Sequence, residues 1–263
     1  MKKLENKVIA ITGAAMGLGL AAAKEAAALG AQLSLIDYNE NALGEAKQAI
    51  LKEHPETKLI TVTADVSKEE EVKKYVDETM KAFGHIDGFY NNAGIEGKQA
   101  LMTEYDVAMF KKVIDINLMG VFFGMRYIIP IMQKQQYGRI VNVASVGGIR
   151  GVLNQTPYVA SKHAVSGMTK NAALEFGRYG IITNAIAPGA ILTPMVAEAF
   201  RQVNPDDPKA AEMEYAKANP TKRLGLPEEV AKLVVFLLSE DASYVNGQTI
   251  AIDGGESNSY GFV

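Results

Sequence analysis

The sequence predicts an α/β fold, a single doubly wound domain in which a seven-stranded parallel sheet is flanked by helices. Short runs rich in β-branched residues alternate with longer amphipathic stretches, as in repeated βαβ units. The short runs are apolar without a clean apolar–polar alternation, which is typical of parallel strands covered on both faces. A chain of 263 residues that is 48% hydrophobic can bury a core of this size.

This alternation predicts the position of each strand and helix along the chain. Strands are expected at residues 7–12, 32–36, 58–63, 86–90, 139–143, 181–187 and 248–252. Helices are expected at residues 17–29, 40–52, 68–83, 106–134, 157–179 and 227–238. No Pro/Gly/Ser-rich linker, low-complexity tract or internal repeat divides the chain, so residues 1–263 are expected to form one domain.

Residues 188–226 depart from this regularity. They carry five prolines and separate the sixth strand from the last helix. Long insertions in compact domains are usually lids or binding loops, so we expect a substrate-binding lid here. The alternative is a disordered surface excursion, because the middle of the segment is strongly polar.

Composition excludes several kinds of chemistry. The 27 Lys and Arg residues against 30 Asp and Glu residues leave a net charge of −3, which argues against nucleic acid as a partner. The chain has no cysteine and only three scattered histidines, so we expect no disulfide, no thiolate nucleophile and no metal site. Its start lacks the apolar stretch of a secretory signal, and no apolar run approaches ~20 residues. A cytoplasmic protein without a membrane partner is therefore expected.

A glycine-rich turn joins the first strand to an alanine-rich helix. The residues of this turn that are candidates for phosphate binding are Gly13, Met16, Gly17, Leu18 and Gly19. Glycines let the backbone approach a pyrophosphate, and the helix N-terminus presents free N–H groups and a partial positive charge. The spacing is GxxxGxG rather than GxGxxG, and a plain structural turn is the alternative.

Asp37 ends the second strand, 18 residues beyond Gly19. A carboxylate there can accept hydrogen bonds from both adenosine ribose hydroxyls and would repel a 2′-phosphate. No nearby Arg or Lys would bind that phosphate, so NAD is favoured over NADP as the cofactor. Asp37 could instead cap the next helix, a role that Asn39 could fill as well.

Two further loops follow strands at the same edge of the sheet. After the third strand come Asp65, whose side chain could bond the adenine amino group, and Val66. An Asp in this context is also typical of a helix start. After the fourth strand come Asn92, Ala93 and Gly94, small residues that would let the backbone pass the ribose. Ligands of such sheets bind outside the carboxyl ends of the strands. The presence of several candidate loops at this edge therefore strengthens the prediction of a cofactor site.

Tyr158 and Lys162 are four residues apart on a predicted helix and therefore share a face. Free tyrosine has a pKa near ~10; lowering it to ~7 takes roughly 4 kcal/mol, which a desolvated ammonium and a nicotinamide ring could supply. Taken alone, such a pair is more often surface packing.

Two polar residues add to this pair. Ser145 follows the fifth strand, 13 residues before Tyr158, where its hydroxyl can hold a substrate oxygen against the tyrosine. Asn117 is a polar residue among apolar neighbours in the long helix. A buried asparagine must be hydrogen-bonded, and its alternative role is a bond to nearby backbone or water.

TGxxxGxG, NNAG, the internal Asn, the Ser and Tyr-x-x-x-Lys, in this order and spacing, resemble the short-chain dehydrogenase/reductase family over essentially the whole chain. The resemblance implies a Rossmann-type domain and hydride transfer between NAD(H) and a ketone or secondary alcohol. It implies the following catalytic roles. Ser145 orients the carbonyl oxygen, Tyr158 donates the proton, Lys162 lowers the pKa of Tyr158 and binds the nicotinamide ribose, and Asn117 positions a water that relays protons. Residues 188–193 resemble the family's nicotinamide-side loop, with Pro188, Gly189, Ile191 and Thr193 as cofactor contacts.

The substrate is expected to be small. Residues 94–98, 144–151, 177–181 and 184–195 resemble a narrower group, the bacterial cyclic ketone and diketone reductases of the levodione reductase type. Val146, Val152, Leu153, Met195 and the lid are expected to line the pocket, with little charge beyond Glu96. Arg150 and Arg201 are expected to be solvated, which argues against an anionic substrate. A sugar- or 3-oxoacyl-thioester-directed enzyme and a non-catalytic dinucleotide sensor remain alternatives.

The family resemblance also implies a homotetramer. Residues 234–238 and 260–263 are apolar enough to seek a partner, although a helix buried in its own chain gives the same pattern.

Overall fold

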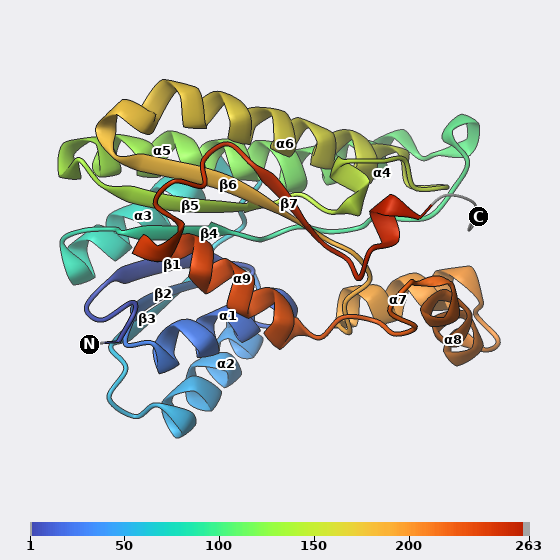
Figure 1. Cartoon of the computed structure of the whole chain (residues 1–263), viewed down its shortest axis with the longest axis horizontal. Helices are drawn as coiled ribbons and strands as arrows, with labels where there is room; N and C mark the ends of the chain where they lie inside the picture. Colours follow the sequence, from blue (N-terminus) through green and yellow to red (C-terminus); the bar gives the residue numbers. More distant parts are fainter. Residues whose placement is uncertain (1, 260–263) are drawn as a thin grey trace.

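The computed structural model describes residues 2–259 and contains one parallel sheet in the order β3-β2-β1-β4-β5-β6-β7 (Figure 1). The strands are β1 (Val8–Thr12), β2 (Gln32–Asp37), β3 (Leu59–Thr63), β4 (Gly88–Asn91), β5 (Gly138–Val143), β6 (Ile181–Pro188) and β7 (Thr249–Ile252). The chain begins in the middle of the sheet, runs outward to β3, and returns to β4 before running outward to β7. The predicted doubly wound fold is confirmed, and each predicted strand lies within two residues of an observed one.

Helices cover both faces of the sheet (Figure 1). They are α1 (Gly17–Ala28), α2 (Glu40–Glu53), α3 (Glu69–Phe83), α4 (Val107–Ile114), α5 (Gly120–Gln135), α6 (Thr156–Phe176), α7 (Pro194–Val203), α8 (Pro208–Ala218) and α9 (Pro227–Leu238). Neighbouring residues of β1 show why its sequence is apolar throughout. Ile9 and Ile11 join the buried cluster beneath α1 and α9, whereas Ala10 joins the cluster beneath α3, α5 and α6.

The long helix predicted over residues 106–134 is interrupted. A π-helical turn, η2 (Asp115–Met119), separates α4 from α5, and the N–H of Gly120 donates to the carbonyl of Asp115. The continuous stretch Val107–Gln135 has the length and hydropathy of a membrane-spanning helix, which the expectation of no long apolar run overlooked. It packs against the sheet, where Val121 and Ile128 are buried, and the core helix of a soluble protein meets the same criterion.

Residues 188–226 are predicted to be a lid or loop, but they contain two helices, α7 and α8 (Figure 1). Two of the five prolines in this segment begin helices. Pro194 and Pro208 each occupy the first turn, where a missing N–H costs nothing. Thr193 caps α7 through the N–H of Val196, and Asp207 caps α8 through the N–H of Ala210. The polar middle of the segment is therefore a helix start.

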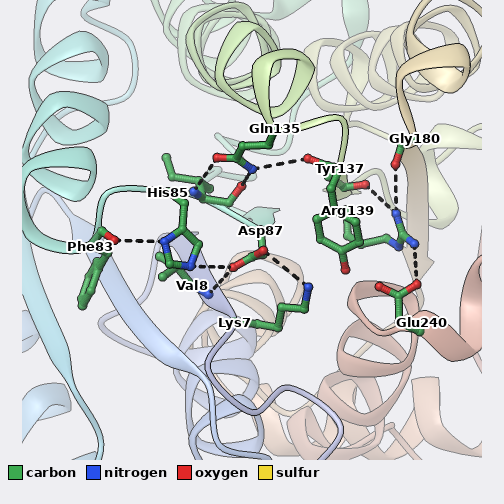
Figure 2. A network of polar contacts seen from close by, with 12 residues as sticks. Lys7, Val8, Phe83, His85, Asp87, Gln135, Tyr137, Arg139, Gly180 and Glu240 are labelled. Atoms are coloured by element: carbon green, nitrogen blue, oxygen red, sulfur yellow. Dashed lines mark hydrogen bonds and ion pairs between the residues drawn. The ribbon is translucent and has the colours of Figure 1, made fainter.

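A polar network closes the amino ends of β1 and β4, at the edge of the sheet opposite the carboxyl ends (Figure 2). Asp87 accepts a hydrogen bond from the N–H of Val8 (2.8 Å) and pairs with Lys7 and His85. The Gln135 side chain accepts from the N–H of Ile86 and donates to its carbonyl. These contacts hold residues 86 and 87, immediately before β4.

The same network continues to β5 through a buried arginine (Figure 2). Arg139 donates to Glu240 at 2.9 Å and to the carbonyl of Gly180 at 3.1 Å, and its guanidinium stacks on Tyr137. The network therefore ties the starts of β1, β4, β5 and β6 to the chain after α9.

Candidate active site

The predicted site residues lie at or after the carboxyl ends of strands β1 to β6, on α6, or in the π-helical turn η2. The loops that follow β1 and β4 leave adjacent strands and run in opposite directions along the sheet, as the strand order requires. Such a point is where doubly wound sheets bind ligands.

The glycine turn after β1 depends on the missing side chains. A Cβ added at Gly19 would lie 2.0 Å from the carbonyl oxygen of Gly13, so any other residue would push α1 away from the turn. Gly13 and Gly17 have positive φ angles of 63° and 55°. No side chain within residues 2–259 caps α1, and its first turn holds no acidic residue. Its N–H groups are thus available to an anion, and the turn fits a dinucleotide pyrophosphate.

Thr12, which the sequence analysis did not single out, joins this turn to the loop after β4. Its Oγ1 accepts hydrogen bonds from the N–H groups of Asn92 (3.0 Å) and Ala93 (3.1 Å). The Asn92 amide donates in turn to the carbonyls of Thr12 and Gly13. Because both of these acceptors belong to the protein, the side-chain N–H groups of Asn92 position the two loops, and a cofactor contact by Asn92 stays a prediction.

Asp37 is buried at the end of β2 beside the glycine turn. Its two oxygens accept hydrogen bonds from the N–H groups of Ala15 and Asn39, each at 3.1 Å. Asn39 is the residue that caps α2, through the N–H of Ala42. The alternative in which Asp37 caps the helix is therefore wrong, and a contact between its carboxylate and an adenosine ribose stays a prediction.

Asp65 and Val66 follow β3, but their side chains serve the protein. The Asp65 carboxylate accepts hydrogen bonds from the N–H and hydroxyl of Ser67, and α3 begins later, at Glu69. Val66 packs against α5, since a Cβ at Gly120 would lie 2.9 Å from its side chain. An adenine contact by Asp65 stays a prediction.

Tyr158 and Ser145 face each other across Gly147. A Cβ at Gly147 would lie 3.4 Å from the Tyr158 ring and 3.6 Å from Ser145 Oγ. Ser145 Oγ also accepts a hydrogen bond from the N–H of Gly147. Burial raises the pKa of Tyr158 to about 12, the hydrogen bond with Ser145 lowers it, and the charge of Glu96 raises it. The expectation that Lys162 and a bound nicotinamide ring together lower this pKa towards 7 stays a prediction.

Lys162 lies one turn further along α6 and is buried. Its ammonium donates to the carbonyl of Val143 at 2.8 Å and lies 5.6 Å from the centroid of the Tyr158 ring. Burial lowers the pKa of Lys162 to about 8. The predicted pairing on one helix face thus places a positive charge beside the phenol.

Asn117 lies in the π-helical turn and is completely buried. Its Oδ1 accepts from the N–H of Ile95 and its Nδ2 donates to the carbonyl of Ile95, both at 2.8 Å. The alternative role, in which the Asn117 side chain bonds to nearby backbone, is therefore confirmed. The side chain holds the loop after β4. Both polar atoms of the Asn117 side chain are bonded to Ile95. The predicted water relay through Asn117 stays a prediction.

The nicotinamide-side loop approaches the glycine turn. A Cβ at Gly17 would lie 3.5 Å from the Thr193 methyl group, so this loop and the phosphate turn meet across the predicted cofactor site. Ile191 is buried and forms an isolated parallel bridge with Gly225. Pro188 ends β6, and a Cβ at Gly189 would lie 2.9 Å from Asp253.

Arg150 is not the solvated residue that we expected. It pairs with Glu256, which also accepts a hydrogen bond from the Tyr215 hydroxyl at 2.6 Å. Glu256 thus joins the loop after β5 to α8. Arg201 is exposed and pairs with Glu198, as expected. Of the predicted lining, Val146 is buried and Leu153 and Met195 are exposed.

Known proteins resemble this chain along nearly its whole length. The family profile described as enoyl-(acyl carrier protein) reductase matches residues 13–257. Levodione reductase of Leifsonia aquatica is 50% identical over 258 residues, covering 98% of this chain and 97% of the relative. The chain belongs to the short-chain dehydrogenase/reductase family. Cyclohexanol dehydrogenase of an Acinetobacter species is 39% identical, over 96% of this chain and 95% of that relative.

Solved structures of short-chain dehydrogenases/reductases have the same fold. The crystal structure of levodione reductase superposes with a TM-score of 0.97, at 50% identity, covering 98% of this chain and all of that one. An NAD+-bound xylitol dehydrogenase reaches 0.92 at 34% identity over 97% of this chain, again covering all of that one. A variant actinorhodin polyketide ketoreductase with NADPH reaches 0.91 at 32% identity, over 97% of this chain and 98% of that one. These matches confirm the family resemblance and its fold.

Within this short-chain dehydrogenase/reductase, the structure brings Ser145, Tyr158 and Lys162 together as predicted. Asn117 is connected to them through Ser161, whose hydroxyl lies 3.4 Å from Asn117 Nδ2 and donates to the carbonyl of Tyr158. Sequence reasoning missed Thr12 and Glu256. Thr12 precedes the first glycine of the turn and could have been noticed there, whereas Glu256 has no local pattern.

Proposed function

We propose that the protein is an NAD(H)-dependent oxidoreductase that interconverts a cyclic ketone or diketone and the corresponding secondary alcohol. The observation that carries this is the placement of Ser145, Tyr158 and Lys162 beside one another at the carboxyl edge of the sheet. The substrate class is supported by the printed names of two relatives, levodione reductase and cyclohexanol dehydrogenase.

The protein's residues act on the oxygen of the substrate. When bound, the nicotinamide cofactor supplies or accepts the hydride at the carbon. The Ser145 hydroxyl is placed to hydrogen-bond a carbonyl oxygen and hold it against Tyr158. With a pKa of about 12, the phenol of Tyr158 is protonated near neutral pH and can donate to that oxygen as it gains charge. In the oxidative direction the phenolate of Tyr158 accepts the proton of the alcohol, and the Lys162 ammonium favours formation of that phenolate because it stabilises the negative charge.

An uncharged substrate is supported by the arginines of this region. Arg150 is paired with Glu256, and Arg201 is paired with Glu198 on an exposed face of α7. Because a carboxylate already neutralises each guanidinium, neither attracts a substrate anion as strongly as an unpaired arginine would. This argues against the acyl-thioester alternative.

The test is the nicotinamide absorbance band, followed with NADH and with NADPH over cyclic diketones, simple cyclic ketones, sugars and acyl thioesters. We expect oxidation of NADH with the ring ketones. Faster turnover of a sugar or a thioester would contradict the proposed substrate class. Binding of NADH without turnover of any substrate would instead identify a dinucleotide-sensing protein.

Preference for NADH over NADPH is proposed from the carboxylate of Asp37. Asp37→Asn keeps an oxygen acceptor for the N–H of Ala15 but removes the charge that repels a 2′-phosphate. We expect the ratio of kcat/KM for NADH over that for NADPH to fall by about tenfold, the effect of roughly 1.4 kcal/mol. Glu40→Gln, which removes a carboxylate from the first turn of α2, is the control. An unchanged ratio in Asp37→Asn, or a wild-type preference for NADPH, would show that Asp37 does not select the cofactor.

We also propose a homotetramer, in line with the family resemblance. The segment of residues 234–238 gives less support than expected, because Val234, Leu237 and Leu238 are buried against α1 within the same chain. The tail of residues 260–263 lies outside the described residues. Better support comes from exposed apolar side chains on α5 and α6, Phe122 and Leu174. Sedimentation equilibrium at micromolar concentration is expected to give four times the 28.3 kDa chain mass, and a monomer would refute this.

The single-domain organisation and cytoplasmic location stay predictions of the sequence.

A further inference from the structure

Glu256 is an acid that connects parts of the site without belonging to any of its motifs. It begins a short turn, η6 (Glu256–Asn258), after β7, and its side chain is only 11% exposed. Its Oε1 accepts hydrogen bonds from the Arg150 guanidinium and, at 2.6 Å, from the Tyr215 hydroxyl. Two segments that are far apart in the sequence therefore meet at one carboxylate oxygen.

The Arg150 side of this contact leads to the loop that carries Ser145. In the turn after β5, the N–H of Gly148 donates to the carbonyl of Ser145 at 2.8 Å, and the N–H of Arg150 donates to the carbonyl of Val146 at 3.0 Å. These overlapping bonds make residues 145–150 one compact turn. A shift of Arg150 would therefore be transmitted to Ser145, the residue placed to hold the substrate carbonyl.

The Tyr215 side of the contact leads to the predicted lid. Tyr215 is on α8, and its ring packs at 65° against the ring of Phe200 on α7, with 5.7 Å between the ring centroids. Burial raises the pKa of Tyr215 and the charge of Glu256 raises it further, so the hydroxyl stays a proton donor near neutral pH. At the end of α8, the Asn219 amide donates to the carbonyl of Asp253 at 2.9 Å. The chain after β7 thus holds α8 directly and α7 through the stacked rings.

The nicotinamide-side loop lies against the other oxygen of Glu256. Oε2 is buried and has no hydrogen-bond partner in the part of the chain that the structure describes. A Cβ at Gly189 would lie 2.9 Å from this oxygen and 2.9 Å from the Cβ of Asp253. The N–H of Gly189 donates to the carbonyl of Ile252 at 3.1 Å. One carboxylate therefore lies where the Ser145 loop, the nicotinamide-side loop and the lid meet.

We propose that Glu256 is a positioning residue, whose carboxylate holds the lid and the Ser145 loop at fixed positions relative to the nicotinamide-side loop. The inference rests on the proposed function and deepens it, because hydride transfer requires the ketone carbon to be aligned with the nicotinamide. Glu256 bonds to Arg150 and Tyr215 rather than to the catalytic side chains, so it acts through these two residues. When either bond is lost, the separation of the elements around the substrate varies, and fewer bound complexes have the reacting geometry.

The first measurement is the rate constant of a single turnover. Enzyme with bound NADH is mixed with excess cyclohexanone, and the nicotinamide absorbance is followed by stopped flow. Tyr215→Phe removes the hydroxyl that bonds Glu256 and keeps the ring that packs on Phe200. We expect its rate constant at saturating ketone to fall about tenfold, with the dissociation constant of NADH unchanged. A variant that only folded poorly would lower the amplitude, because fewer molecules react, and would keep the wild-type rate constant.

Glu256→Ala removes both bonds and is expected to lower the rate constant at least as far as Tyr215→Phe does. In the double variant, Tyr215→Phe is expected to add less than about a twofold loss, because the carboxylate through which it acts is already absent. A further loss of about tenfold would show that Tyr215 acts independently of Glu256 and would overturn the inference. Because Glu256→Ala leaves Arg150 unpaired, Tyr215→Phe alone decides the inference if Glu256→Ala does not fold.

The control for these variants is Glu53→Ala. It also removes a carboxylate that joins two elements, since Glu53 at the end of α2 pairs with Lys24 of α1 at 2.6 Å. We expect its single-turnover rate constant to match that of the wild type.

The second measurement, amide hydrogen exchange, does not depend on turnover. In Tyr215→Phe we expect faster exchange within α7 and α8 and unchanged exchange within the sheet, because only the attachment of the lid is weakened. Faster exchange along the whole chain would instead show a loss of global stability, and the role of Tyr215 and Glu256 would then be structural only.

Failure of the inference and failure of the proposed function give different results. If ring ketones are reduced but Tyr215→Phe has the wild-type rate constant, the inference fails and the proposed function stands. If the wild type reduces no ring ketone, the proposed function fails and the positioning role fails with it.

Discussion

Tyr158→Phe is expected to bind NADH normally and to lose kcat by roughly 10³-fold, within the range of removing a positioned proton donor. The variant keeps the ring that packs against Gly147 and removes only the hydroxyl, so the fold and the cofactor turn are unchanged. Binding is measured by NADH fluorescence, and turnover by the decrease of nicotinamide absorbance with a cyclic ketone.

The matched control is Tyr179→Phe. This tyrosine is in the turn after α6, and its hydroxyl accepts a hydrogen bond from Arg178 on the surface. We expect its activity to match the wild type. Near-normal turnover in Tyr158→Phe would remove Tyr158 from the mechanism and with it the assignment of the proton donor.

Lys162→Met is expected to make the protein more stable at pH 7 while it abolishes turnover. The folded-state pKa of Lys162 is about 8, against an ordinary value of 10.5, so folding must desolvate a charge at any pH below 8. At about 1.4 kcal/mol per unit this costs ~3 kcal/mol. The variant also leaves the Val143 carbonyl without its donor, which costs about 1 kcal/mol. A net gain of about 2 kcal/mol in the free energy of unfolding is expected.

The pH dependence has a definite sign. Between pH 8 and pH 10.5 the unfolded chain binds the Lys162 proton and the folded chain does not, so the stability of the wild type rises with pH in this window. The advantage of Lys162→Met over the wild type should therefore shrink as pH approaches 10.5. Urea denaturation at pH 7 and pH 10 measures both effects.

Lys170→Met is the control, because Lys170 is exposed on the same helix. Its free energy of unfolding should change by less than about 0.5 kcal/mol. If Lys162→Met is less stable than the wild type at pH 7, then the bond to Val143 outweighs the desolvation of the ammonium.

Much of the fold could be predicted because strand patterns and βαβ alternation are local. All seven strands follow from apolar runs of a few residues, and the glycine turn follows from its position between a strand and a helix. The helices α7 and α8 were missed because Pro194 and Pro208 begin helices, whereas proline inside a sequence pattern more often ends one. The capping residues Thr193 and Asp207 were present in the sequence and would have indicated both starts.

The site was predicted where its residues fall in short motifs and missed where they meet only in space. Tyr158 and Lys162 share a helix face, so their spacing predicts their proximity. Glu256 and Arg150 are 106 residues apart, and no local pattern relates them. The state of Tyr158 could not be predicted either, because its pKa depends on how deeply the folded chain buries the phenol.

The π-helical turn at Asn117 has a consequence for changes in chain length. A π turn contains one residue more than an α turn, and each residue added to an α-helix rotates everything beyond it by about 100°. Removing one residue from η2 would restore regular helix and turn Asn117 away from Ile95, or turn α5 away from the sheet. The rotation of α4 about the helix axis, relative to α5, thus depends on the one additional residue of the π turn. A single substitution in this helix leaves that rotation unchanged. Deletion of a single residue there is expected to disrupt the site.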